Sequence, residues 1–294
     1  MTTHSETGSV FQSRKFGDFA PIKESLISRR LNASFILAPL AMKLVEDGVP
    51  IRIVYLGHRD GTTLMVGKDS PIREFTDLRG KTVAIPNRFS NQSLLMHRMM
   101  KRWGMGPDSI KLIEVPPPEH PTALSAGSVD GYIVGEPFAA LSEIKGFGRP
   151  LYYTKDMWPN FISCVLVVRK EMIDEERALV QELVDGIAKS GKWLDQGLEH
   201  RMDAAQIVGK HVNFQDPKLL EFVLSKPPDR VKYSNLAPLQ ADFEEIMDLA
   251  IEVGILKRRL AFEEYVDTSF VAPVERLDWG FDQLPRPTAA EVGK

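Results

Sequence analysis

Short apolar runs alternate with amphipathic segments along roughly the first 170 residues of the chain. Runs rich in β-branched residues and bounded by Gly, Pro or polar residues are typical of strands. They predict strands at 34–37, 51–56, 62–66, 82–85, 109–115, 131–134 and 161–168. The remaining apolar positions predict helices at 22–31, from Pro39 to about Val45, at 91–103, at 122–126 and through most of the chain after Glu171.

The segment 91–103 is the most regular of these predicted helices. Leu95, Met99 and Trp103 follow one another at intervals of four residues, so they share one helix face. Gly104 comes directly afterwards, and a glycine in that place usually ends a helix. This segment therefore predicts a helix with one face in the core.

The order of the elements predicts the fold class. Strands that alternate with helices are typical of α/β proteins with parallel sheets, and helices dominate the last 120 or so residues. The chain has 294 residues, 43% hydrophobic and 26% charged, which suffices for one large domain or two lobes.

The net charge of −3 favours neither nucleic acid nor an anionic membrane as a partner. The single cysteine, Cys164, lies in an apolar run and predicts packing rather than chemistry.

Three predicted strand ends carry polar residues. The strand ending at Ile85 runs into the polar loop 86–93 and then a helix, whose free N–H groups and positive dipole end favour an anion. His58 follows another strand, and Glu136 lies between a strand and a helix. N-capping, a polar turn and dipole complementation by Glu136 are the ordinary explanations. Because ligands bind at the carboxyl ends of strands in open α/β sheets, the three together also predict a ligand site.

Common catalytic and nucleotide-binding motifs are missing from the sequence. The stretch GTTLMVGKD at 61–69 is not a phosphate-binding loop, because five residues separate its glycines and Asp69 follows Lys68. There is no HExxH, CxxC or Gly-x-Ser-x-Gly motif. The sequence therefore indicates binding more than catalysis.

Three stretches carry a family resemblance: LRGKTVAIP, EVPPPEHPTALSAGSVDGYIVGEPFAAL and ISCVLVVRKEMI. They resemble the substrate-binding proteins of ABC importers for nitrate, bicarbonate, sulfonates and taurine, over residues from about Arg30 to about Phe270. The Val-Pro-Pro-Pro stretch, Asp130-Gly131 and 134–137 are most similar to the nitrate and bicarbonate branch. The resemblance implies a two-lobed α/β fold of the type II periplasmic-binding class, with parallel-core sheets flanked by helices and a helical C-terminal part.

The resemblance also implies a division of the chain. Two crossing strands near 62–68 and 161–169 would join the lobes. The division is a disordered lead at 1–17, a first lobe at 18–69 with 161–284, a second lobe at 70–160 and a loose tail at 285–294.

In this family the ligand lies in the cleft between the lobes. Carried onto this sequence, the implied ligand site consists of Pro39, His58, Arg88, Ser90, Asn91, Gln92 and Glu136. In bicarbonate-binding relatives an acidic residue of this region helps to hold a metal beside the anion. Glu136 is the corresponding candidate, and calcium is the expected ion.

The resemblance implies a solute-binding protein without catalytic activity, which binds a small anion or organic solute in the cleft between the lobes as the lobes close. Its partners would be an ABC permease and an ATPase, with no nucleic acid, and the chain would be a monomer. A cytoplasmic enzyme on the same fold, as in thiamin-pyrimidine or menaquinone synthesis, is the alternative. The sensing half of a regulator is a third possibility, although no helix-turn-helix precedes the domain.

The start of the chain differs from the family pattern. Residues 1–17 are polar and lack the apolar stretch of a signal peptide. The resemblance implies the periplasm, whereas the sequence as it stands predicts a cytoplasmic location or a truncated start. The first strand and helix of the family also have no counterpart, which predicts a reduced first lobe with exposed strand edges and lower stability.

Overall fold

A computed structural model describes residues 11–211 and 216–272 of the chain. The predicted tail at 285–294 and the first ten residues of the predicted lead lie outside this part. Residues 11–18 form neither helix nor strand, and the first helix begins at Phe19.

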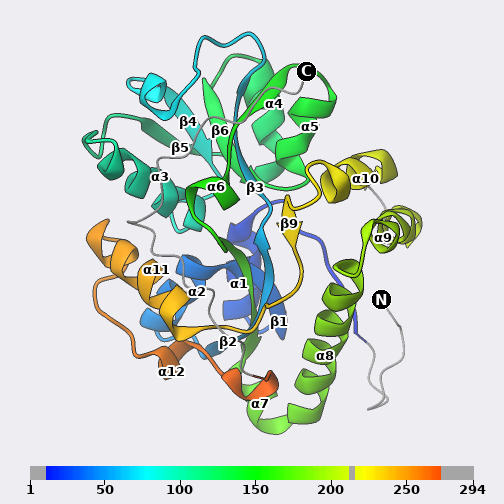
Figure 1. Ribbon diagram of the computed structural model, residues 1–294. Helices are drawn as coiled ribbons and strands as arrows, with labels where there is room; N and C mark the ends of the chain where they lie inside the picture. The colour runs from blue at the N-terminus through cyan, green and yellow to red at the C-terminus, as the bar shows by residue number, and fades with distance from the viewer. Residues whose placement is uncertain (1–10, 212–215, 273–294) are drawn as a thin grey trace.

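The described elements form two bodies, each built on one sheet (Figure 1). The first body surrounds a four-stranded sheet and includes α1, α2, α11 and α12, and the second surrounds a five-stranded sheet and includes α3, α4 and α5. The lobe boundaries expected from the sequence stay predictions. The helices are α1 (Phe19–Ile27), α2 (Ala38–Glu46), α3 (Asn91–Arg102), α4 (His120–Ser125), α5 (Phe138–Ile144), α6 (Thr154–Met157), α7 (Lys170–Glu175), α8 (Arg177–Leu194), α9 (Leu198–His211), α10 (Pro217–Ser225), α11 (Gln240–Glu252) and α12 (Phe262–Tyr265), with short 3-10 turns at Phe75–Leu78, Pro117–Glu119 and Thr268–Phe270.

The sheet of the first body has the strand order β1-β8-β2-β9, and all its strand pairs are antiparallel. This corrects the sequence-based expectation of parallel strands for this sheet. The reason is that β8 returns from the second body and lies between β1 and β2, which both run against it. Its strands are β1 (Ala33–Leu37), β2 (Ile51–Asp60), β8 (Ile162–Arg169) and β9 (Val231–Lys232).

The sheet of the second body has the order β5-β4-β6-β3-β7 and contains the predicted parallel core. Strand β4 pairs in parallel with both β5 and β6, whereas β3 pairs antiparallel with β6 and β7. Its strands are β3 (Thr62–Gly67), β4 (Thr82–Ile85), β5 (Lys111–Glu114), β6 (Gly131–Gly135) and β7 (Gly148–Tyr153).

Two segments carry the chain between the bodies. Strand β2 leads through Gly61 directly into β3, and β7 leads through α6 into β8. Gly61 has a φ of +66°, and a Cβ there would lie 3.0 Å from Nδ1 of His58 and from a methyl group of Val231. A glycine is therefore favoured at the first crossing, both for its backbone conformation and for the limited space around it.

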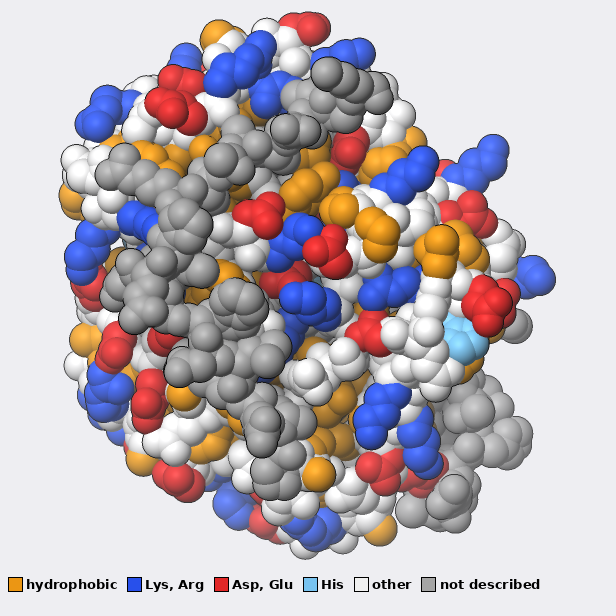
Figure 2. All heavy atoms as spheres, in the orientation of Figure 1, with side chains coloured by type: hydrophobic (Ala, Val, Ile, Leu, Met, Phe, Trp, Pro, Cys, Tyr) orange, Lys and Arg blue, Asp and Glu red, His pale blue; other side chains and the backbone are white. Residues whose placement is uncertain are grey.

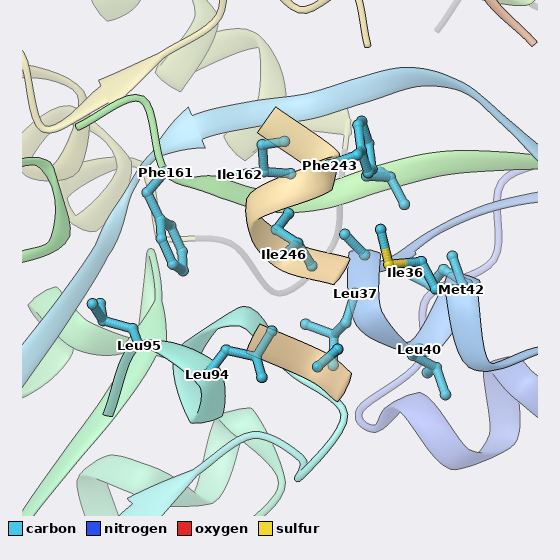
Figure 3. Close-up of a cluster of buried hydrophobic side chains, with 14 of the residues drawn as sticks. Ile36, Leu37, Leu40, Met42, Leu94, Leu95, Phe161, Ile162, Phe243 and Ile246 are labelled. Carbon is cyan, nitrogen blue, oxygen red and sulfur yellow. The ribbon is translucent and has the colours of Figure 1, made fainter. Parts of the chain in front are cut away.

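The main apolar core continues from one body into the other (Figure 3). Leu37 at the start of α2 and Ile246 of α11 belong to the same buried cluster as Leu94 and Leu95 of α3. Ile162 of the crossing strand β8 lies in this cluster as well. The helix face predicted around Leu95 therefore packs where the two bodies meet.

Helices α9 and α10 extend the contact between the bodies. They pack on each other, and α10 also contacts α5 of the second body. The chain then returns to the first body, where β9 pairs with the end of β2. Within residues 11–211 and 216–272, no helix has the length and hydropathy needed to cross a bilayer.

Candidate functional site

The start of α3 holds three of the predicted site residues. Ser90 is fully buried and is the N-cap, because its hydroxyl oxygen accepts the N–H of Ser93 at 3.0 Å. The amide nitrogen of Asn91 donates to the carbonyl oxygen of Ile162. The amide nitrogen of Gln92 donates to the Thr62 hydroxyl at 3.3 Å. These side chains tie the first turn of α3 to both crossing strands.

Two acceptor atoms at this helix start have no partner. Asn91 Oδ1 and Gln92 Oε1 are buried and make no hydrogen bond in the part of the chain that the structure describes. The orientation of the Asn91 amide follows from its partner, because a carbonyl oxygen accepts and never donates. An unmade bond of this kind costs about 1–3 kcal/mol, so a solute with a hydrogen-bond donor would be favoured here.

Two further predicted site residues, Pro39 and Arg88, differ in their exposure to solvent. Pro39 is buried in the first turn of α2, where its missing N–H costs no hydrogen bond. The Arg88 side chain is 73% exposed, pairs with Glu114 at 3.7 Å and covers the ring of Phe89. The structure therefore buries Pro39 and leaves Arg88 exposed.

His58 lies in β2 just before the first crossing. Its side chain is half-buried, and burial lowers the pKa of its imidazole to about 4. Its Nδ1 has no hydrogen-bond partner among the described residues, and its ring centre lies 6.3 Å from that of Tyr233. A histidine of this kind is neutral at pH 7, so it offers a solute a hydrogen bond but no positive charge.

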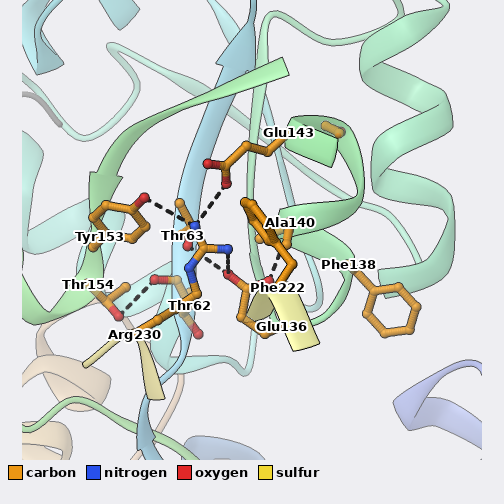
Figure 4. A network of polar contacts seen from close by, with 12 residues as sticks. Thr62, Thr63, Glu136, Phe138, Ala140, Glu143, Tyr153, Thr154, Phe222 and Arg230 are labelled. Carbon is orange, nitrogen blue, oxygen red and sulfur yellow. Dashed lines mark hydrogen bonds and ion pairs between the residues drawn. The ribbon is translucent and has the colours of Figure 1, made fainter. Parts of the chain in front are cut away.

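Glu136 is buried at the end of β6, and three groups engage its carboxylate (Figure 4). One oxygen accepts from the Thr63 hydroxyl at 3.1 Å and lies 3.3 Å from Nη1 of Arg230. The other accepts the N–H of Ala140 at 2.9 Å, in the first turn of α5. Burial raises the pKa of the carboxyl, and the positive charge of Arg230 opposes that rise.

The predicted residues do not form one cluster. Gln92 binds Thr62 and Glu136 binds Thr63, and these are adjacent residues of β3. Adjacent side chains of a strand point to opposite faces of its sheet. The start of α3 and the carboxylate of Glu136 therefore lie on opposite faces of the first crossing strand.

Two charged residues that the sequence analysis did not select lie beside Glu136 and His58. Arg230 is fully buried, and Asp60 is fully buried and ion-paired with Lys232 at 3.0 Å. Burial raises the pKa of Asp60, which Lys232 counteracts. Both pair with residues distant in sequence, so no local signal in the sequence could have suggested them.

The metal expected at Glu136 rests on the family resemblance alone. Among the described residues, no three His, Cys, Asp or Glu side chains are grouped as metal ligands would be. Because Arg230, Thr63 and Ala140 already engage the carboxylate, a calcium ion would compete with the positive charge of Arg230 for it.

Comparisons with known proteins agree with the resemblance. The model of the NMT1-like family matches residues 5–209. The nitrate import ATP-binding protein NrtC of Synechocystis sp. is 26% identical over 68% of this chain and 33% of its own length. The taurine-binding periplasmic protein of Escherichia coli is 26% identical over 65% of this chain and 62% of its own length. The matched part of this chain thus covers between a third and somewhat under two thirds of the length of these curated relatives.

Solved structures confirm the fold class. The ligand-binding component of an ABC-type import system from Staphylococcus aureus superposes with a TM-score of 0.78 at 24% identity, covering 95% of this chain and 89% of that one. The alkanesulfonate-binding protein SsuA from Xanthomonas axonopodis pv. citri has a TM-score of 0.76 at 17% identity, covering 90% and 89%. At these identities the likeness shows the periplasmic-binding fold alone.

Proposed function

Because this chain belongs to the NMT1-like family, we propose that it is the solute-binding component of an ABC importer and performs no catalysis. The observation that most supports the proposal is the junction between the bodies. Leu37 at the start of α2 and Leu95 of α3 come from different bodies and share one buried cluster. Separation of the bodies would expose this cluster, and a solute held between the two helix starts would favour closure.

We propose further that the solute belongs to the nitrate, bicarbonate, sulfonate and taurine class. The relatives' names support this, since one imports nitrate and another binds taurine. The start of α3 suits an anionic group because of its helix dipole. Its unpartnered acceptors on Asn91 and Gln92 favour a solute that also donates a hydrogen bond. The partners would be a permease and an ATPase, and the location would be the periplasm.

A thermal-shift screen tests the proposal. The probes are nitrate, bicarbonate, taurine and ethanesulfonate, each with and without calcium. A solute at a hundred times its dissociation constant stabilises the folded chain by about 2.7 kcal/mol. We expect one probe to raise the melting temperature, and we expect the bound solute to be recovered chemically unchanged.

Two variants make the screen specific. Gln92→Ala should reduce the shift caused by the active solute, because Gln92 lies at the start of α3. Arg88→Ala is the matched control from the neighbouring loop and should keep the full shift, because Arg88 points to solvent. If none of the four probes changes the melting temperature, or if the solute is converted to a product, the proposed function is wrong.

A further inference from the structure

A short stretch of the C-terminal half contacts both bodies. We call residues 217–232 the strap; it consists of α10, the loop after it and β9. At one end α10 packs on α5 of the second body, and at the other end β9 pairs with β2 of the first body. The strap is thus a third link between the bodies, in addition to the two crossings (Figure 1).

The apolar contact of the strap with the second body is small. It consists of Val223 and Val231 on the strap against Ala140 of α5, with a few half-buried side chains around them. Charged groups surround this contact. Asp229 of the strap pairs with Lys155 at 2.6 Å. On the face drawn in Figure 2, basic and acidic side chains lie next to one another around the centre, where Figure 1 places β9.

Arg230 carries the deepest contact of the strap. Its side chain is 1% exposed, and its Nη2 donates to a Glu143 oxygen at 2.8 Å and to the Tyr153 hydroxyl at 3.1 Å. Nη1 lies 3.3 Å from Glu136. The guanidinium carbon lies 5.1 Å from the ring centre of Tyr153 and 5.3 Å from that of Phe222, within cation–π distance of both.

These groups match a guanidinium ion in charge, and Nη2 of Arg230 makes its hydrogen bonds, whereas Nε and Nη1 have no hydrogen-bond partner among the described residues. Two carboxylates on the second body face one cation, and the aromatic rings of Tyr153 and Phe222 lie against it (Figure 4). Burial alone would lower the pKa of Arg230, but the charges of Glu136 and Glu143 raise it overall. A lysine ammonium has neither the planar fork nor the stacking surface of this group.

We propose that Glu136, Glu143 and Tyr153, with Phe222, form a guanidinium-binding site that Arg230 of the same chain occupies, and that this occupancy fastens the strap to the second body. The site explains why a carboxylate lies at the end of the buried strand β6: it receives a cation from a segment nearly a hundred residues later. The occupant is internal, so the inference does not depend on which solute the protein binds.

Hydrogen exchange of the strap, with chemical rescue, tests this. In Arg230→Ala we expect the amides of α10 and β9 to exchange about a hundredfold faster. The reason is that removing one partner of a buried ion pair leaves the other charge buried without compensation, which is strongly unfavourable. The amides of α2 should keep their protection. Guanidinium chloride at low millimolar concentration should restore slow exchange in the strap by filling the vacated site, and ammonium chloride at the same concentration should not.

Further variants keep the test decisive. Glu143→Gln, at a half-buried position, should loosen the strap by a smaller factor if Arg230→Ala does not fold. Arg149→Ala is the matched control, since Arg149 is also buried but binds the carbonyl oxygens of Lys68, Ser70 and Ile72. It should leave exchange in the strap unchanged. The proposal is overturned if Glu143→Gln and Arg230→Ala leave strap exchange at the wild-type rate, if exchange rises equally everywhere, or if ammonium rescues as well as guanidinium.

Discussion

Acid should destabilise this protein through its buried histidines, and His120 allows the effect to be measured. His120 is fully buried at the start of α4, and its Nε2 lies 2.8 Å from the carbonyl oxygen of Val115. A carbonyl only accepts, so Nε2 carries the proton and Nδ1 is the bare nitrogen. Nδ1 has no partner among the described residues. Protonation would place an unpaired charge in the core.

The size of the effect follows from the pKa. Burial lowers the pKa of His120 to about 4, from an ordinary value of 6.5. The folded state thus binds this proton less readily than the unfolded state. The stabilising contribution of neutral His120 is complete above pH 6.5 and is lost as the pH falls towards 4. The loss is about 2 kcal/mol by pH 5 and about 3 kcal/mol by pH 4.

Urea unfolding at several pH values between 7 and 5 measures this loss. Because burial also lowers the pKa of His58 and of His97, the wild-type slope contains the contributions of all three histidines, and a variant must isolate that of His120. His120→Gln keeps a donor for the Val115 carbonyl but does not titrate. Its unfolding free energy should therefore fall by about 2 kcal/mol less than that of the wild type between pH 7 and 5.

Ser125→Ala is the control, because Ser125 is an exposed, non-titrating residue of the same helix. It should reproduce the wild-type slope. If His120→Gln also reproduces that slope, then His120 is not a buried neutral group and the argument from its hydrogen bond fails.

Two predictions concern α3, which packs where the two bodies meet. Ser90→Ala should lower the unfolding free energy by about 1 kcal/mol, because the hydrogen bond that caps α3 at Ser93 is lost. Ser90→Gly should lower it by only about a few tenths of a kcal/mol. Equal losses in the two variants would contradict the capping role of Ser90. Leu95→Ala removes a fully buried side chain between the bodies and should cost about 3–5 kcal/mol in urea unfolding. Ile144→Ala, at a 44% exposed position, should cost far less, and a similar cost would show that Leu95 is not packed in the core.

The local elements of the second body could be predicted well from the sequence. Strand β4 begins and ends where its apolar run does, and α3 begins directly after Ser90, as its capping chemistry requires. Strand β7 was missed, because Gly148 and Pro150 interrupt its pattern. It lies at the edge of the sheet, where a proline is tolerated because one side of the strand needs no partner.

Strand direction in the first body could not be predicted. The apolar run of β8 is equally compatible with a parallel and an antiparallel partner, and its place between β1 and β2 depends on the path of the whole chain. Strand β9 has only two residues, too few for any periodicity to show. Both are consequences of tertiary arrangement rather than local preference.

The candidate site shows the same limit. Ser90, Asn91 and Gln92 could be selected because a polar helix start after a strand is visible in the sequence. Arg230 could not, since its partners Glu136 and Glu143 lie 94 and 87 positions away, and nothing local distinguishes a buried arginine from a surface one.

The contacts of Glu136 and those of the start of α3 lead to a division of roles between the two faces of β3. Glu136 has one oxygen shared by Thr63 and Arg230 and the other bound by Ala140, so it keeps little capacity for a solute or a metal. An anion placed beside it would also meet the negative charge of Glu143. The opposite face, at Gln92, has unpartnered acceptors and a helix dipole instead. The proposed solute site therefore belongs to the start of α3, and the carboxylate at the end of β6 belongs to the strap.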